Sequence, residues 1–160
     1  MIEYRVTKYD PALRDIGGAY ALPDWSSFTD IGCMFNGSPL SEAEYLQVEN
    51  AYISSALEFL CESGVSSLAV RELENHRGAQ LTFGEGSTLS LEQLKTALPR
   101  VLREEFWCKF EGPDSFIHIG YDYYMYVGVP TPCSKAEQVA AGIGLFVEPF
   151  KSPYGGLVAA

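Results

Sequence analysis

Hydrophobic residues recur along this chain at two different spacings, one typical of strands and one typical of helices, and these spacings predict its secondary structure. Residues 2–9 alternate polar with apolar or aromatic side chains, which is the pattern of a half-buried strand. Residues 41–63 carry apolar side chains every three or four positions, which predicts a helix with one broad apolar face. Ser41 and Glu44 form a capping box at its start, and Gly64 is the expected stop.

The same two periods predict the rest of the secondary structure. Further strands are expected at residues 66–73, 105–111, 115–121, 124–129 and 145–150. Helices are expected at residues 90–104, where Pro99 should kink or split the helix, and at 134–141, where Ser134 and Glu137 form a second capping box. Strands that follow one another as hairpins imply an antiparallel or mixed sheet. The chain is therefore predicted to form a single α+β domain, residues 1–160, with about five to six strands and the helices packed on one face.

Residues 10–40 show neither period and are predicted to be a long irregular loop. Glycine, proline and the pair Asn36-Gly37 mark turns within it. Because such long connections are rare in compact domains, the loop is either a binding element or an ordered wrap over one edge of the sheet. Five apolar side chains are expected to hold it in place: Trp25, Phe28, Ile31, Met34 and Phe35. Residues 152–160 are predicted to be a loosely held tail.

Composition narrows the class of protein. A chain of 160 residues fits one domain, and 47% hydrophobic residues indicate a folded globule. No apolar run approaches the roughly 20 residues of a membrane helix. The N-terminus lacks a basic segment followed by an apolar core, so we expect a cytoplasmic protein. The four cysteines are not spaced as metal ligands, so we expect reduced thiols, no metal and no other cofactor.

The charge is strongly one-sided. The net charge of −10 argues against a nucleic-acid partner, which would require a basic face. Residues 15–70 contain no lysine or arginine but eight acidic side chains: Asp15, Asp24, Asp30, Glu42, Glu44, Glu49, Glu58 and Glu62. This stretch is either a solvated face of an acidic protein or a surface that attracts a basic partner.

One of these carboxylates, Glu49, falls in the middle of the apolar face of the helix at 41–63. A lone buried charge is costly, so the carboxylate must be paired or its pKa must rise. We interpret it as hydrogen-bonded to a tyrosine or paired with a base such as Arg5 or Lys109. The alternative is a small enzyme in which Glu49 and His118 act as the acid and base groups.

Residues 116–129 hold four of the ten tyrosines and one of the two histidines. Pairing Phe110 with Ile117 collects the apolar side chains of the three hairpin strands on one side. The other side then carries Trp107, Lys109, Glu111, Phe116, His118, Gly120, Tyr124 and Tyr126. That composition is typical of a protein-recognition face, although helices covering this side would make it core instead. In this register Cys108 and His118 lie on opposite sides, which argues against a cysteine nucleophile with a histidine base.

Three stretches resemble those of a family of small uncharacterised acidic bacterial α+β proteins. They are residues 4–11 (YRVTKYDP), 48–52 (VENAY) and 116–126 (FIHIGYDYYMY). Some proteins of this kind look similar to immunity proteins, which neutralise antibacterial toxins. The resemblance covers most of the chain and implies protein binding rather than catalysis. It carries over no functional residue.

The sequence thus predicts a cytoplasmic protein-binding protein of the immunity type, which neutralises a basic toxin domain through an acidic, tyrosine-rich surface. We interpret it as a binding protein rather than an enzyme, with no nucleic-acid or membrane partner. The residues predicted to contact the partner are Asp15, Asp24, Trp25, Asp30, Trp107, His118, Tyr124 and Tyr126. The sequence leaves the oligomeric state open.

Overall fold

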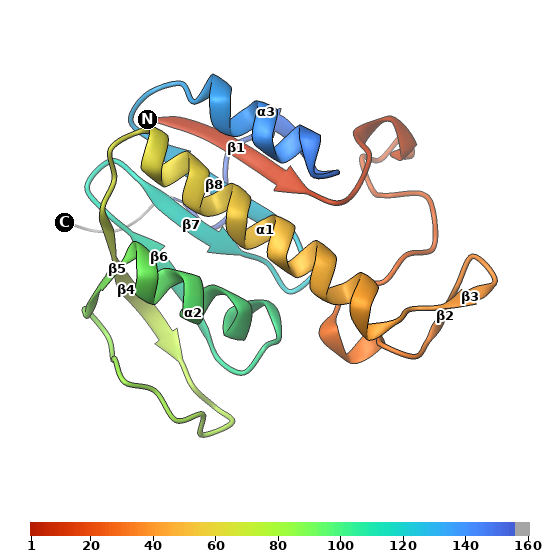
Figure 1. Cartoon of the computed structure of the whole chain (residues 1–160), viewed down its shortest axis with the longest axis horizontal. Helices are drawn as coiled ribbons and strands as arrows, with labels where there is room; N and C mark the ends of the chain where they lie inside the picture. The colour runs from red at the N-terminus through yellow and green to blue at the C-terminus, as the bar shows by residue number, and fades with distance from the viewer. Residues whose placement is uncertain (156–160) are drawn as a thin grey trace.

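A seven-stranded antiparallel sheet forms the centre of the computed structural model, which describes residues 1–155 (Figure 1). Its strands are β1 (Ile2–Thr7), β4 (Ser67–Glu74), β5 (Thr88–Ser90), β6 (Trp107–Glu111), β7 (Phe116–Ile119), β8 (Met125–Val129) and β9 (Phe146–Pro149). They lie in the order β5-β4-β6-β7-β8-β1-β9. The predicted α+β class is confirmed. The sheet is larger than the expected five to six strands because the three-residue strand β5 is too short to show a period.

Three helices cover one face of this sheet, as predicted (Figure 1). They are α1 (Glu42–Glu62), α2 (Leu91–Leu102) and α3 (Ser134–Gly142). The longest, α1, contacts both other helices and strands β1 and β8. Ser41 caps it by accepting a hydrogen bond from the Glu44 backbone, and Gly64 follows with a φ of 75°, the left-handed conformation that ends many helices. The second helix, α2, continues as one helix through Pro99.

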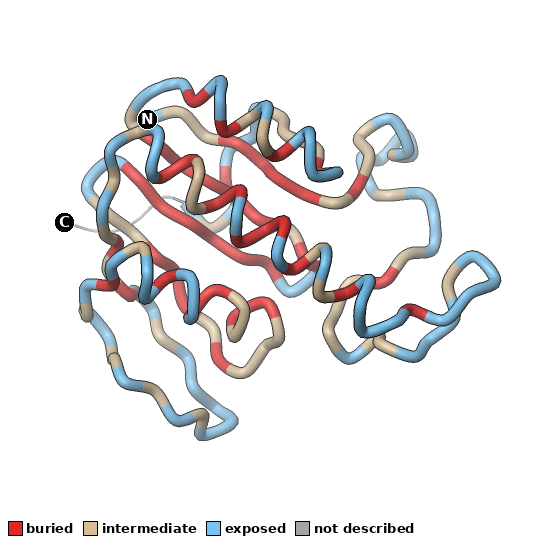
Figure 2. Tube along the Cα trace, viewed as in Figure 1, coloured by how far each residue is buried: buried red, intermediate tan, exposed pale blue. Residues whose placement is uncertain are grey.

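The register predicted for the central strands is confirmed. Phe110 pairs with Ile117, which in turn pairs with Val127. All three side chains belong to the hydrophobic core beneath the helices, where Figure 2 shows the strands mostly in red. Because side chains alternate along a strand, His118 faces the other side of the sheet. We call that side, which the three helices leave uncovered, the far face.

The start of α3 differs from the prediction. The N-cap residue is Cys133, and no side chain within α3 makes the expected capping-box bond between Ser134 and Glu137. Instead the carboxylate of Glu62, the last residue of α1, accepts hydrogen bonds from the backbone of Lys135 at 3.1 Å and Ala136 at 2.6 Å. A carboxylate from a neighbouring helix thus satisfies the free N–H groups and the positive end of the helix dipole.

The irregular segment, residues 10–40, projects from the body of the protein beyond the start of α1 (Figure 1). It contains two short 3-10 turns and a hairpin, at Pro11–Leu13, Phe28–Asp30 and β2 (Met34–Phe35) with β3 (Ser38–Pro39). Most of its backbone is drawn pale blue in Figure 2, as exposed. Four of its five predicted anchors are at least partly buried, but Met34 is 63% exposed because the two-residue strand β2 presents it to solvent.

The C-terminal segment, residues 150–155, lies over the far face. The backbone N–H of Phe150 donates to the Glu3 carbonyl, and that of Ser152 donates to the Glu3 carboxylate, both at 3.2 Å. Ser152 is only 4% exposed, and the Tyr154 ring packs 5.8 Å from that of Trp107. Residues 152–155 are therefore docked rather than loosely held, because their polar and aromatic groups find partners on the sheet. The rest of the predicted tail lies outside the described residues.

Candidate partner-binding site

The turn between β7 and β8 is where the irregular segment meets the body of the protein. Tyr123 in this turn has a φ of 66°, a left-handed conformation that is uncommon for a bulky side chain. Its hydroxyl donates to Tyr45 Oη at 3.0 Å, and its carbonyl accepts from the Tyr52 hydroxyl at 2.8 Å. Both partners belong to α1. The helix thus holds this strained turn in one conformation.

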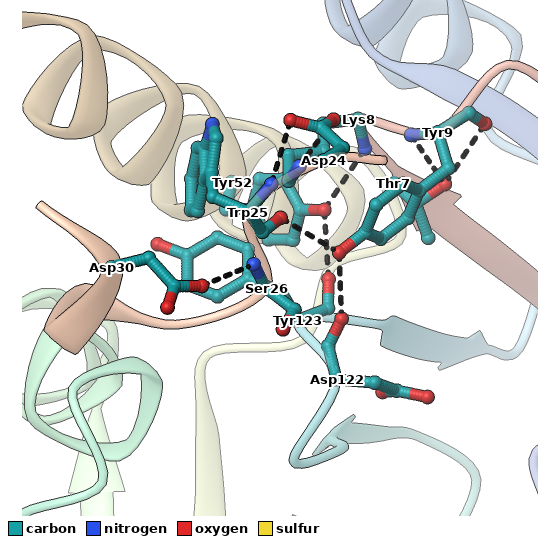
Figure 3. Close-up of polar contacts among 10 residues, drawn as sticks. All are labelled: Thr7, Lys8, Tyr9, Asp24, Trp25, Ser26, Asp30, Tyr52, Asp122 and Tyr123. Carbon is teal, nitrogen blue, oxygen red and sulfur yellow. Dashed lines mark hydrogen bonds and ion pairs between the residues drawn. The ribbon is translucent and has the colours of Figure 1, made fainter. Parts of the chain in front are cut away.

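Trp25 fastens the irregular segment to this turn (Figure 3). Its indole packs against the rings of Tyr45 and Tyr123, with centroids 5.3 and 4.9 Å away, and is 6% exposed. The Tyr9 hydroxyl lies 2.8 Å from the Asp122 carbonyl and 3.2 Å from that of Trp25, so it links the turn and the segment. The predicted anchoring role of Trp25 is therefore confirmed, and its burial leaves little of the ring for a partner.

Lys8 and Asp24 form an ion pair next to the Trp25 ring (Figure 3). Lys8 Nζ lies 2.6 Å from Asp24 Oδ2 and 4.1 Å from the centroid of the Trp25 ring. Burial lowers the pKa of Lys8, and the hydrogen bond to Asp24 opposes that shift. The negative charge of Asp24 is thus largely balanced by the positive charge of Lys8. It contributes less to long-range attraction than a free carboxylate does.

Glu49 is held on the helix side of the sheet by three hydrogen bonds. Its carboxylate accepts from the Tyr45 hydroxyl at 2.6 Å and from Arg103 Nε and Nη2 at 2.9 and 2.8 Å. The residue is 3% exposed. The structural interpretation of Glu49 therefore matches this geometry, with a tyrosine and a base as expected. The base is Arg103, because Arg5 pairs with Glu148 and Lys109 with Glu72.

His118 lies buried on the far face, with the sheet between it and Glu49. Its Nδ1 is 2.8 Å from Ser152 Oγ, while its Nε2 has no hydrogen-bond partner among residues 1–155. Glu111 Oε1 is 3.6 Å from Nε2, beyond hydrogen-bond distance. Burial, aided by the charge of Lys109, lowers the pKa of His118 to about 3, so the imidazole is neutral at pH 7. Glu49 and His118 therefore cannot act on one substrate.

Cys108 also lies on the opposite side of the sheet from His118. Its side chain belongs to the core beneath the helices, and burial raises the pKa of its thiol to about 12. It therefore stays protonated and lacks the reactivity of a nucleophile. Within residues 1–155 no cluster of three or more histidine, cysteine, aspartate or glutamate side chains is arranged to hold a metal ion. In that same part of the chain no helix is both long and apolar enough to cross a membrane.

The eight predicted contact residues fall into two groups. Asp15, Asp24, Trp25 and Asp30 lie in the irregular segment, whereas Trp107, His118, Tyr124 and Tyr126 belong to the strands or turn of the far face. Asp15 is exposed, while Asp30 accepts a hydrogen bond from the Ser26 backbone at 2.9 Å. Trp107 and Tyr124 are half-buried. His118 and Tyr126 are only 1% and 5% exposed, so a partner reaches them only if the C-terminal segment moves.

The irregular segment also presents apolar side chains that sequence patterns did not identify as contacts. Four of the eight exposed large hydrophobic residues in residues 1–155 lie between positions 13 and 34: Leu13, Ile16, Leu22 and Met34. Ile16 is fully exposed, at 108%, and Met34 is 63% exposed. Their neighbours in sequence include glycine and proline, the only local signal of an exposed loop tip. This concentration of exposed apolar groups is typical of an interaction site.

Comparison with known proteins adds nothing to this geometry. No protein-family model, curated protein or solved structure matches the chain. The resemblance to immunity proteins therefore stays a prediction. The function has to be argued from the arrangement of the side chains themselves.

Proposed function

We propose that this protein binds and neutralises a basic protein domain, as immunity proteins do for toxins, and that the irregular segment is its main contact surface. The observation that carries the proposal is a projecting segment that is at once acidic, apolar at its tips and firmly anchored. Surface segments of monomeric proteins seldom combine these properties without a binding role.

The acidic charge of the segment supports a basic partner. Arg14, at its start, pairs with Glu148, and residues 15–70 contain no other base. Asp15 in the segment and Glu42 and Glu44 in the adjoining first turn of α1 are exposed, so their charges act on the solvent rather than within the core. An unopposed field of this kind accelerates the approach of a cationic surface and disfavours an acidic one.

The exposed apolar side chains supply contact area that charge alone does not. Ile16, Leu22 and Met34 can each enter a pocket on a partner, where burial releases ordered water. The Trp25 anchor fixes the loops that carry them before the partner arrives. Less conformational entropy is then lost on binding, which raises the affinity for a given contact area.

The compartment is part of this proposal. The four cysteines all lie in the described part of the chain and are unpaired. Unpaired thiols fit the reducing conditions of the cytoplasm, which is where we place the binding reaction.

A pull-down with the product of the neighbouring gene tests the proposal, together with protection of cells that express that product. Asp15→Asn removes a charge but keeps an acceptor for the Ala19 backbone, which Asp15 Oδ1 binds at 3.0 Å. Combined with Ile16→Ser, it should weaken binding by about tenfold or more. Glu92→Gln, which removes an exposed charge on α2, is the matched control.

Two outcomes would contradict the proposal. The first is that the candidate partner neither binds nor is neutralised by the native protein. The second is that the Asp15→Asn, Ile16→Ser variant binds as tightly as the Glu92→Gln control while both keep the native circular dichroism spectrum. The second outcome would place the contact surface elsewhere on the molecule.

A further inference from the structure

A small pocket of about 160 Å³ opens between the end of β4, the residues after α2 and the β7–β8 turn. Its lining includes Glu74, Glu104, Glu105, Trp107, Gly120 and Tyr121. Sites for metabolites and drugs occupy about 300 Å³ or more, whereas one water takes about 30 Å³. The pocket therefore has room for the end of one side chain rather than for a whole small-molecule ligand.

One wall of the pocket is aromatic. The rings of Trp107 and Tyr121 are nearly parallel, with an interplanar angle of 22° and centroids 6.3 Å apart. The Trp107 indole N–H donates to the Ile119 carbonyl at 2.8 Å, which satisfies its polar group and fixes the ring. Tyr121 remains 59% exposed. Aromatic faces of this kind attract cations, and a planar guanidinium group also stacks on them.

The remaining wall is acidic. Glu105 accepts from Arg100 Nε at 3.0 Å, and Glu74 accepts from the Tyr121 hydroxyl at 3.4 Å. Glu104 has no ion-pair or hydrogen-bond partner for its side chain in the part of the chain that the structure describes. Three carboxylates thus line the pocket, beside the guanidinium of Arg77 and the imidazole of His76. The combination favours a cationic occupant that also offers several N–H donors.

We propose that this pocket binds the guanidinium group of an arginine side chain. Lysine has a compact ammonium group that neither stacks on the ring pair nor reaches two carboxylates at once. The arginine would come from the basic partner, and to that extent the assignment rests on the proposed function. The pocket lies close to the irregular segment, so one partner can contact both. Tyr121 belongs to the same turn that anchors Trp25. Arg103, which precedes Glu104 of the pocket, lies 4.9 Å from the centroid of the Phe28 ring in the irregular segment.

Titration of the isolated protein with N-acetyl-arginine methylamide tests the pocket without any partner. The two tryptophan indole N–H resonances are the readout in a proton–nitrogen NMR spectrum. The Trp107 resonance should move with saturation on the order of millimolar, while that of buried Trp25 should stay in place. The uncharged citrulline analogue and the lysine analogue are the matched ligand controls.

Two variants locate the binding. Glu104→Gln removes the unpaired carboxylate and Tyr121→Ala removes the exposed ring, so each should weaken arginine binding about twofold to fivefold. Glu92→Gln should leave it unchanged. The assignment is overturned by an unmoved Trp107 resonance at the solubility limit, by equal effects of arginine and either analogue, or by full binding in both pocket variants. If arginine binds but the pull-down fails, the pocket stands and only the proposed function falls.

Discussion

Each face of the sheet buries a titratable side chain, Glu49 on the helix side and His118 on the far face, and the two faces treat these groups differently. On the helix side, Glu49 forms an ion pair with Arg103, and its carboxylate accepts three hydrogen bonds, two of them from Arg103. On the far face, His118 is neutral and uses one ring nitrogen, while its Nε2 has no partner among residues 1–155. The helix face satisfies the buried charge by supplying a cation, whereas the far face excludes the charge by depressing the pKa.

The difference shows that a buried ionisable group does not by itself mark an active site. Each group makes its hydrogen bonds within the protein, and the sheet separates the two. Exposed apolar side chains instead gather in the irregular segment, and Tyr121 is exposed in the β7–β8 turn. These are the two places where binding is proposed. Free energies of unfolding measured for variants on each face test this difference between Glu49 and His118. They also separate effects on stability from effects on partner binding.

The largest expected effect comes from removing the cation on the helix face. Arg103→Met leaves the Glu49 charge buried without its partner, so the free energy of unfolding should fall by about 3 kcal/mol. Urea denaturation followed by circular dichroism measures the change. The exposed Arg77→Met change is the control, with an effect within about 0.5 kcal/mol. A native midpoint for Arg103→Met would show that the pair does not stabilise this face.

The second effect is a pH dependence that belongs to the far face. Because the folded protein lowers the pKa of His118 to about 3, the unfolded chain binds a proton there first as the pH falls below about 6.5. Stability contributed by the neutral ring is therefore complete above that pH and decreases towards pH 3. Between pH 7 and pH 5 the native protein should lose about 2 kcal/mol from this residue.

Comparison of two histidine variants isolates this contribution. His118→Gln should show a smaller loss of stability between pH 7 and pH 5 than the native protein. His76→Gln, which changes the exposed histidine, should keep the native loss. Equal slopes for the native protein and His118→Gln would mean that the buried ring keeps an ordinary pKa.

The sequence predicted on which side of the sheet Glu49 and His118 lie, and it predicted the kind of contact that Glu49 makes. It placed Glu49 on the apolar face of a helix and His118 on the side of the sheet opposite Cys108, because periods of 3.6 and 2 residues fix which way side chains point. It did not identify Arg103, which is 54 positions from Glu49. Pairing over that distance depends on how helices pack, which a local pattern does not contain.

The candidate site was less predictable for the same reason. The absence of a period marked residues 10–40 as irregular, and Trp25 was expected to anchor them. Yet the exposure of Ile16 and Met34 follows from how the loops project, and the burial of His118 follows from a C-terminal segment that was expected to be loose. Such contacts join single side chains that are far apart in the sequence, as His118 and Ser152 are, so only the assembled fold reveals them.

A third prediction compares one serine from each face. Ser152 Oγ accepts from the Tyr154 backbone at 3.1 Å and bonds to His118 Nδ1, so Ser152→Ala should cost about 1 kcal/mol. Ser55, on α1 at the helix side of the sheet, has a buried hydroxyl without a hydrogen-bond partner in the described residues. Ser55→Ala should therefore be neutral or stabilising. A loss from Ser55→Ala as large as that from Ser152→Ala would contradict this assignment.

The smallest expected effect on stability lies outside both faces, at the tip of the irregular segment. Ile16 is fully exposed, so Ile16→Ser should change the free energy of unfolding by no more than about 0.5 kcal/mol. Ile53, an equal side chain at 7% exposure on α1, is the matched control, and Ile53→Ser should cost about 3 kcal/mol. If Ile16→Ser lowered stability as Ile53→Ser does, its side chain would be packed rather than presented. A loss of partner binding without a loss of stability is what a recognition surface requires, because its apolar groups are buried only in the complex.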